Sequence, residues 1–223
     1  IRPAFENQDA VVHLAGYPLT DGSWDTILEN NIVGMYNALE AARDAGVSSF
    51  VFSSSNHVVG MYELEYEPEI YRPEFGLVVD HESPRRPDSF YGVSKSFGED
   101  LGRYFVDNYE YPEQFYAIRI GSVRSEPYDH PYGDAERCVD RGECERGTEK
   151  YQTLVARMKS LWQSRHDLAH QVDRCLRNQS VDFDVFYGVS DNDRRWFDLE
   201  HARSVLGYYP RDNGEEWDGP PER

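Results

Sequence analysis

Apolar runs and helical stretches alternate along the first half of the chain, and this alternation restricts the fold more than any other feature. Residues 25–45 and 89–108 have the apolar spacing of amphipathic helices. Strand, helix, strand, helix, strand at this spacing requires crossover connections, so we predict a parallel sheet with helices packed on it. The three apolar runs that read as buried strands are residues 9–16, 49–54 and 115–120.

The second half of the chain is less regular. Residues 124–150 are polar and interrupted by Pro and Gly, which predicts an irregular insertion, and residues 61–88 predict an ordered surface excursion. We therefore expect a first domain at residues 1–123 and a region at 124–223 that packs on the same domain. Within that region the patterns predict two helices, a strand and a short helix, at residues 149–162, 165–176, 183–189 and 198–206.

The chain is acidic and poor in lysine. Its 223 residues carry a formal net charge of -18, and only 3 of its 23 basic residues are lysines. This surface charge is typical of a protein from a salt-loving organism, although an ordinary acidic protein rich in arginine fits the same count. A net charge of this sign argues against nucleic acid as a partner, because nucleic acid is itself strongly negative.

Membrane, secretion and disulfide signals are weak in this sequence. No run of 18 apolar residues and no charged-then-apolar leader occurs, so we expect neither a membrane span nor secretion. The three cysteines, Cys138, Cys144 and Cys175, are an odd number without framework spacing, which predicts reduced thiols in a cytoplasmic protein. We discount a metal site at His166 and His170, or at the first two cysteines, because neither pair has a complete ligand pattern.

The feature that carries chemistry is a tyrosine four residues before a lysine. Tyr91 and Lys95 open the helical stretch at 89–108 and fall on one helical face. A lysine ammonium there favours the charged form of the phenol, whose ordinary pKa is about 10. The pair therefore predicts a general base that works near neutral pH. A serine at the end of the preceding strand, within 53–55, is placed to hold a substrate oxygen.

Four further segments occur in a fixed order around this pair. They are His13–Gly16 (HLAG), Asn30–Gly34 (NNIVG), Ser53–Gly60 (SSSNHVVG) and Arg119–Ser122 (RIGS). Together with YGVSK they resemble, over about residues 9–125, the extended short-chain dehydrogenase/reductase family of NAD-dependent epimerases and dehydratases. The resemblance implies an α/β, Rossmann-type doubly wound parallel sheet with a small C-terminal substrate-binding region.

The resemblance is sharper within that family. The segments SSNHVVG, RRPDSFYGVSKSFGEDL, ARMKSLW and YGVSDN resemble uronate dehydrogenases and haloarchaeal enzymes that oxidise sugars with NAD. This implies NAD-dependent oxidation of the anomeric hydroxyl of a cyclic sugar (a uronate, a sugar phosphate or an aldose) to a lactone. Two alternatives stay open: a nucleotide-sugar epimerase or dehydratase with tightly bound NAD, and an inactive member that acts as a binding module.

Part of the family pattern has no counterpart in this sequence. The glycine-rich turn after the first family strand and the acidic residue after the second are both absent. These features bind the pyrophosphate and select the ribose, so NAD and NADP both stay open. The sequence opens within what resembles the third family helix. We therefore interpret it as lacking three N-terminal strands, which predicts an exposed edge on its sheet.

The resemblance implies a role for each residue at a matching position. Tyr91 takes the proton of the anomeric hydroxyl, Lys95 lowers the pKa of Tyr91 and holds the nicotinamide ribose, and Ser55 holds the substrate oxygen. Asn31 bends its helix and supports a proton-relay water. An amide inside a helix is otherwise unfavourable, so its presence there fits such a role. The implied cofactor contacts are Leu14, Ala15, Gly16, Asn31, Ser53, Tyr91, Lys95 and Ile120.

The resemblance also implies a set of substrate contacts. Arg157, in ARMKSLW, matches an arginine that grips the substrate carboxylate in uronate dehydrogenases, and a guanidinium suits a phosphate as well. Pro18 stands near the position of a substrate-binding serine in those enzymes, which argues against strict uronate specificity. The implied substrate residues are Ser55, Asn56, His57, Ser122 and Arg157.

Family members commonly form homodimers through a four-helix bundle, to which each subunit contributes two long helices. Residues 25–45 and 89–108 would be those helices here. Several apolar residues on a second face of the two helices suit either a dimer contact or the core, namely Met35, Leu39, Phe97, Leu101 and Phe105.

Overall fold

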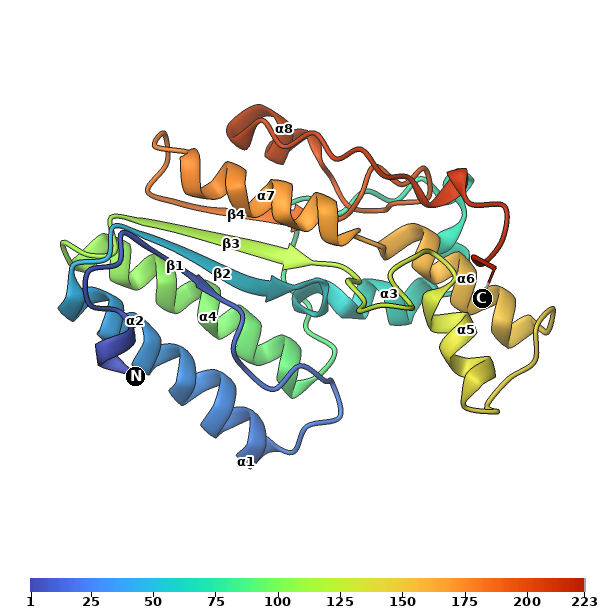
Figure 1. The fold of residues 1–223 in the computed structure, drawn as a ribbon, viewed down its shortest axis with the longest axis horizontal. Coiled ribbons are helices and arrows are strands. Elements are labelled where there is room, and N and C mark those ends of the chain that lie inside the picture. The colour runs from blue at the N-terminus through green and yellow to red at the C-terminus, as the bar shows by residue number, and fades with distance from the viewer. Residues whose placement is uncertain (223) are drawn as a thin grey trace. The chain divides into compact units, whose positions relative to one another are not determined.

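A four-stranded parallel sheet forms the centre of the protein. The structure is a computed structural model that describes residues 1–222, and its strands follow the order β1-β2-β3-β4 (Figure 1). The parallel α/β architecture predicted from the sequence is thereby confirmed. The strands are β1 (Ala10–His13), β2 (Ser49–Ser55), β3 (Gln114–Ile120) and β4 (Phe183–Gly188).

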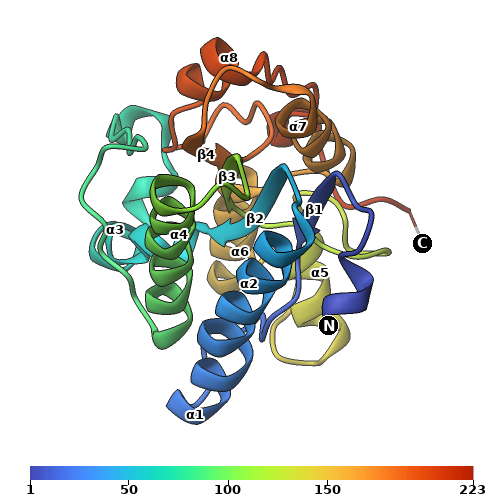
Figure 2. The same ribbon diagram turned by 90° about the vertical axis from the view of Figure 1, so that its left-hand side faces the viewer.

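Helices α2 (Gly34–Ala45) and α4 (Phe90–Asn108) lie side by side against one face of this sheet (Figures 1 and 2). The first ends as predicted at Gly46, which adopts the left-handed conformation with φ 69°. The second begins at Ser89, whose hydroxyl accepts a hydrogen bond from the backbone N–H of Gly92. Both boundaries therefore follow ordinary capping chemistry.

The chain before α2 departs from a regular helix. It continues α1 (Trp24–Ile27) as a π-helical turn at Leu28–Val33, which leads directly into α2. π-Helical turns are rare and often occur at functional sites, and this one contains Asn31.

The core between the helices and the sheet decides which helix face is free. Met35, Leu39 and Phe105 pack in this core against Phe50 and Phe115 of the sheet. For these three residues the structure therefore decides between the two alternatives in favour of the core, and they are not available for a dimer surface. Phe97 and Leu101 are only half-buried. The large apolar residues that α1, α2, α4 and the π-helical turn leave exposed are Trp24, Leu28, Val33, Tyr36, Phe90, Val93 and Tyr104.

Two glycines bring α4 unusually close to the strands. A Cβ at Gly98 would lie 2.4 Å from the Phe52 ring, and one at Gly102 would lie 2.3 Å from the Phe115 ring. Only a residue without a side chain fits at this separation. The close approach holds the start of α4, with Tyr91, beside the carboxyl end of β2.

The described chain forms two compact units. The first contains residues 1–64, 82–119 and 172–186, and the second contains the remaining described residues. The division at residue 123 stays a prediction, because these units follow spatial contact rather than chain order. In the second unit lie α5 (Gly133–Asp140), α6 (Glu149–Leu161) and α8 (Glu200–Leu206). Helices α3 (Gly60–Tyr66) and α7 (Arg165–Arg177) have residues in both units.

The insertion at 124–150 is more ordered than its composition indicates. It contains α5, which packs against α6. The expectation of a wholly irregular insertion is therefore wrong, because buried contacts on one face of α5, at Ala135 and Glu136, outweigh the flanking Pro and Gly.

The expectation of three reduced cysteines is also wrong. Cys138 and Cys144 form a disulfide, and only Cys175 is free, buried within α7. The turn after α5 passes through Gly142 at φ 68° and returns the chain, so that the two bridged Cα atoms lie 5.6 Å apart. Sequence spacing alone cannot show this return of the chain.

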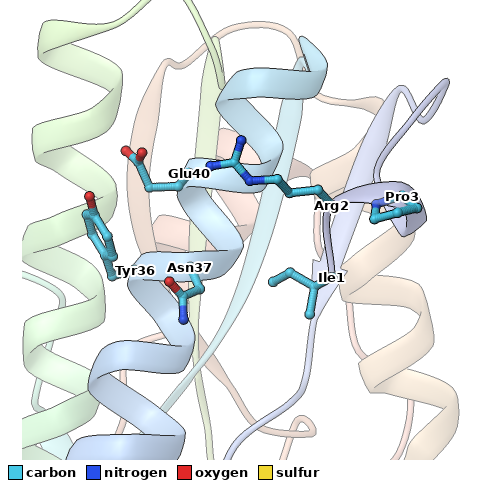
Figure 3. Close-up of a pocket in the computed structure, with 6 residues that line it drawn as sticks. All are labelled: Ile1, Arg2, Pro3, Tyr36, Asn37 and Glu40. Carbon is cyan, nitrogen blue, oxygen red and sulfur yellow. The ribbon is translucent and has the colours of Figure 1, made fainter.

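Strand β1 lies at one edge of the sheet formed by the described residues. A shallow pocket close to this edge is lined by Ile1, Arg2 and Pro3 of the N-terminal turn and by three residues of α2, as Figure 3 shows. None of the predicted site residues lines this pocket. No helix in the described part of the chain is long and apolar enough to cross a membrane.

Candidate active site

Tyr91 and Ser55 meet where α4 begins and β2 ends. Ser55 lies within reach of the Tyr91 hydroxyl, where its own hydroxyl acts to lower the phenol pKa. Ser55 Oγ donates to Asn56 Oδ1 at 3.4 Å and accepts the backbone N–H of His57 at 3.2 Å. The first turn of α4 touches the strand end closely, because a Cβ at Gly92 would lie 2.3 Å from the His57 carbonyl oxygen. The YGVSK and SSSNH segments therefore come together, as a paired base and substrate holder require.

Lys95 lies one helical turn further along and is buried. Its Nζ donates to the Ser53 carbonyl oxygen at 2.6 Å and lies 5.4 Å from the centre of the Tyr91 ring. Burial lowers the pKa of Lys95 to about 8. The lysine is thus positioned by the backbone of β2.

Tyr91 itself has a raised pKa, which differs from the expectation that Lys95 lowers it. Burial raises the pKa of Tyr91, and the hydrogen bond from Ser55 opposes that rise only in part. Lys95 lies over the phenol ring and bonds to the Ser53 backbone, and its charge does not offset this burial.

The lowered pKa of Lys95 predicts a rise in stability at alkaline pH. Between about pH 8 and 10.5 the unfolded chain binds more protons at this group than the folded chain, so the free energy of unfolding increases with pH. The full effect is about 3 kcal/mol. Urea unfolding of the whole protein without added cofactor, from about pH 7 to 10, should show a weaker rise for Lys95→Met than for the wild type.

Lys150→Met is the matched control for this experiment, because Lys150 is exposed. It should keep the pH dependence of the wild type. An equally steep rise in Lys95→Met would contradict the assignment.

Asn31 is buried in the π-helical turn and all its amide atoms have partners. Its Oδ1 accepts the backbone N–H of Tyr17 at 2.7 Å, and its Nδ2 donates to the Tyr17 carbonyl at 3.1 Å. The same Nδ2 donates to Ser94 Oγ at 3.1 Å, a contact on α4 that sequence reasoning missed. Ser94 Oγ in turn donates to the Tyr91 carbonyl at 2.7 Å. Asn31 therefore ties the loop after β1 to the turn that carries Tyr91.

The loop after β1 is open to solvent at the carboxyl end of the sheet. Leu14, Ala15 and Gly16 are all exposed. Gly16 has φ 152°, and a Cβ at this position would lie 3.2 Å from Asn31 Oδ1. Ser53 Oγ anchors the strand end by donating to the His13 carbonyl at 3.0 Å. Ligands bind at this edge in open parallel sheets.

His13 adds a neutral group to this edge. Burial, together with the charge of Lys95, lowers the pKa of the His13 imidazole to about 4. The site therefore carries the positive charge of Lys95 without a second cation at this histidine.

Asn56 and His57 directly follow Ser55 in the sequence. Asn56 is only 2% exposed, and its Nδ2 has no hydrogen-bond partner among the described residues. A buried donor without a partner is costly, which suits a ligand contact. His57 Nδ1 lies 2.6 Å from Asp88 Oδ2, a partner that sequence reasoning missed although the aspartate directly precedes the helix cap.

The remaining predicted residues lie in the second unit, or at its boundary in the case of Ile120 at the end of β3. Ser122 is buried, and its backbone N–H donates to the Leu161 carbonyl at 2.8 Å. Arg157 is half-buried on α6, where its charge helps to lower the pKa of Asp134. The larger lowering comes from Arg124, which donates to Asp134 through two nitrogens at 2.7 and 2.8 Å.

One group of possible metal ligands occurs in the described residues: His166, Asp167 and Asp212. The buried Asp167 carboxylate already accepts hydrogen bonds from Ser190 Oγ at 2.6 Å and from the Arg211 backbone N–H at 2.9 Å. It acts as a structural acceptor between segments of the second unit. His170 does not belong to this group; its Nε2 accepts the Tyr209 backbone N–H at 3.4 Å.

A family model for the NAD dependent epimerase/dehydratase family matches residues 1–137. The chain belongs to this family. An NAD-dependent glucose-6-phosphate dehydrogenase of Haloferax volcanii is 38% identical over 218 residues, which are 97% of this chain and 73% of that protein. A uronate dehydrogenase of Pseudomonas syringae pv. tomato is 36% identical over 210 residues, 94% of this chain but only 62% of that protein.

Solved structures of this family agree with that result. A variant uronate dehydrogenase from Agrobacterium tumefaciens, complexed with NAD, superposes with a TM-score of 0.71 at 30% identity. The match covers 99% of this chain and 71% of that chain. Sugar dehydrogenases are therefore similar to this family member along nearly its whole length, and the relatives are themselves longer.

Proposed function

We propose that the protein is an NAD-dependent dehydrogenase that oxidises the anomeric hydroxyl of a cyclic sugar to a lactone. The observation that carries the proposal is the placement of Tyr91 beside Ser55, with Lys95 buried one turn away and bonded to the Ser53 carbonyl. Relatives that match almost the entire chain are named as an NAD-dependent glucose-6-phosphate dehydrogenase and a uronate dehydrogenase, which supports the oxidation of a sugar. An epimerase or dehydratase uses similar groups, but the relatives of that kind match only 43–44% of this chain.

The residues divide the reaction between them. Ser55 holds the anomeric hydroxyl, and Tyr91 accepts its proton as the C–O bond becomes a carbonyl. NAD, when bound, would supply the acceptor for the hydride that leaves the same carbon. Because the first turn of α4 packs directly on the segment after Ser55, the base and the holder of the hydroxyl are placed together before substrate arrives.

The chain offers a fitting place for the nicotinamide half of the cofactor. Lys95 Nζ has three N–H donors and uses one on the Ser53 carbonyl, so it has donors for ribose hydroxyls. The exposed loop at Leu14–Gly16 supplies an open surface at the strand ends. Ile120, Ser53 and Asn31 complete the proposed cofactor contacts, and the choice between NAD and NADP stays open.

The proposed substrate is an anionic sugar. Arg157 and Ser122 are the proposed contacts in the second unit, and a guanidinium pairs well with a carboxylate or a phosphate. Asn56 contributes its buried Nδ2 as a donor to a sugar oxygen. Uronates and sugar phosphates are both substrates named for the relatives.

The deciding experiment follows NADH appearance with the whole protein in high salt. Glucuronate, galacturonate, glucose 6-phosphate, galactose and arabinose form the substrate panel, with NADP in parallel. We expect turnover with at least one anionic sugar. No turnover with any of them, together with epimerisation of a nucleotide sugar, would overturn the proposal.

We further propose a homodimer in the cytoplasm. The exposed apolar residues Tyr36, Val93 and Tyr104 on α2 and α4 support a helix-to-helix contact, in place of the core residues Met35 and Leu39. Light scattering of the whole protein in high salt tests this, and a monomer would contradict it.

A further inference from the structure

We propose that Asp88 is a positioning residue for His57, and that it fixes the imidazole in the tautomer whose Nε2 accepts a hydrogen bond from a sugar hydroxyl. The proposal rests on the proposed function for the identity of the ligand. Asp88 and His57 lie 31 residues apart in the sequence, and both belong to the first unit.

Both oxygens of the Asp88 carboxylate are in use. Oδ2 lies 2.6 Å from His57 Nδ1, and Oδ1 accepts the Ser89 hydroxyl at 2.8 Å. Burial alone would raise the pKa of Asp88, but the hydrogen bonds from His57 and Ser89 outweigh it and lower the pKa. An ionised carboxylate only accepts hydrogen bonds, so the proton must be on Nδ1 of His57. In a neutral imidazole, Nε2 is then the acceptor.

The backbone leaves this pair little freedom. A Cβ at Gly60 would lie 1.9 Å from Asp88 Oδ2, so only glycine fits opposite the carboxylate. The segment before Asp88 is held by two backbone hydrogen bonds, from Arg86 N–H to the Val58 carbonyl at 2.9 Å and from Met61 N–H to the Arg86 carbonyl at 3.0 Å. Asp88 is therefore fixed with respect to the turn that carries His57.

His57 stands beside the proposed reacting groups. Its ring meets the edge of the Tyr91 ring with 5.8 Å between centroids, and its backbone N–H donates to Ser55 Oγ. Its side chain is partly exposed, 24%, which leaves access for a ligand. A sugar held at Tyr91 and Ser55 has further ring hydroxyls. One of them would donate a hydrogen bond to Nε2 of His57, which carries no proton in this tautomer.

The substitution Asp88→Asn tests the assignment, because an amide donor facing Nδ1 would move the proton to Nε2. We expect kcat/KM for the accepted sugar to fall about 10- to 100-fold, mainly through KM. Deoxyfluoro analogues of that sugar sharpen the test, since fluorine accepts but does not donate. The analogue whose fluorine replaces the hydroxyl that donates to His57 should have a lower kcat/KM than the parent sugar with the wild type. This difference between analogue and parent sugar should disappear in Asp88→Asn.

Nitrogen NMR of His57 in the wild type decides the tautomer without any variant. A proton on Nδ1 alone at about pH 8, well above the ordinary pKa of histidine, supports the proposal. A proton on Nε2 would overturn it, and so would unchanged analogue discrimination in a folded Asp88→Asn. Asp100→Asn, at an exposed carboxylate of α4, is the matched control and should leave kcat/KM unchanged. If no sugar is oxidised, the proposed function fails, while the NMR result still decides the role of Asp88.

Discussion

Replacement of Tyr91 by Phe is expected to lower kcat by about 10²- to 10⁴-fold, the range for loss of a positioned general base. The variant loses only the hydroxyl beside Ser55, while the ring contacts to His57 and Lys95 are retained. Cofactor affinity should therefore change little, because Lys95 and the Ser53 carbonyl that holds it are untouched. NADH appearance gives kcat, and calorimetry with NAD gives the affinity.

Tyr104→Phe is the control for this result. Tyr104 lies on the same helix, is exposed, and has no contact with Ser55 or Lys95 in the described interactions. Its kcat should equal that of the wild type. Persistent turnover in Tyr91→Phe would show that another group is the base.

The second large effect concerns stability. Glu99→Gln is expected to lower the free energy of unfolding by about 3–5 kcal/mol, because it removes the charge of the carboxylate that pairs with the buried Arg119 guanidinium. Glu99 and Arg119 are each 2% exposed and share two hydrogen bonds of 2.9 Å. Ser54 Oγ donates to the same carboxylate at 2.6 Å. Urea unfolding in high salt measures the change.

Asp107→Asn is the matched control, because Asp107 forms an exposed pair with Arg103 on the same helix. Exposed pairs contribute about 1 kcal/mol or less, so its effect should be small. A second variant, Glu99→Met with Arg119→Met, removes both charges and should recover much of the lost stability. Equal stabilities of Glu99→Gln and Asp107→Asn would contradict this account.

The buried pair also connects the elements that carry the proposed site. Ser54 lies between Ser53, which accepts from Lys95, and Ser55, which lies beside Tyr91. Glu99 stands one turn after Lys95 on α4, so the ion pair joins β2, α4 and β3 directly behind the site. The sequence signals SSSNHVVG and RIGS therefore include structural residues, Ser54 and Arg119, beside the proposed site residues.

Interactions across the fold produced the results that sequence patterns did not anticipate. Ser94 looks like an ordinary helix residue and Asp88 like an ordinary residue before a helix, and only folding brings them to Asn31 and His57. The pKa of Tyr91 is raised because burial, which spacing cannot reveal, outweighs the hydrogen bond from Ser55. Met35 could be assigned to the core only from the structure. An apolar helix face in a sequence does not show whether the sheet of the same subunit or a second subunit covers it.

The sequence by itself determined the parallel sheet, both long helices and the Tyr91, Lys95 and Ser55 segments, because apolar periodicity and short motifs are local properties of the chain. It also determined the family, through the order of those motifs. Tertiary structure alone decided the Asp88–His57 pair and the hydrogen bond from Asn31 to Ser94, whose partners lie 31 and 63 residues apart in the sequence. Those contacts depend on which distant segments of the chain meet in the fold, and the local pattern of the sequence does not show which segments these are.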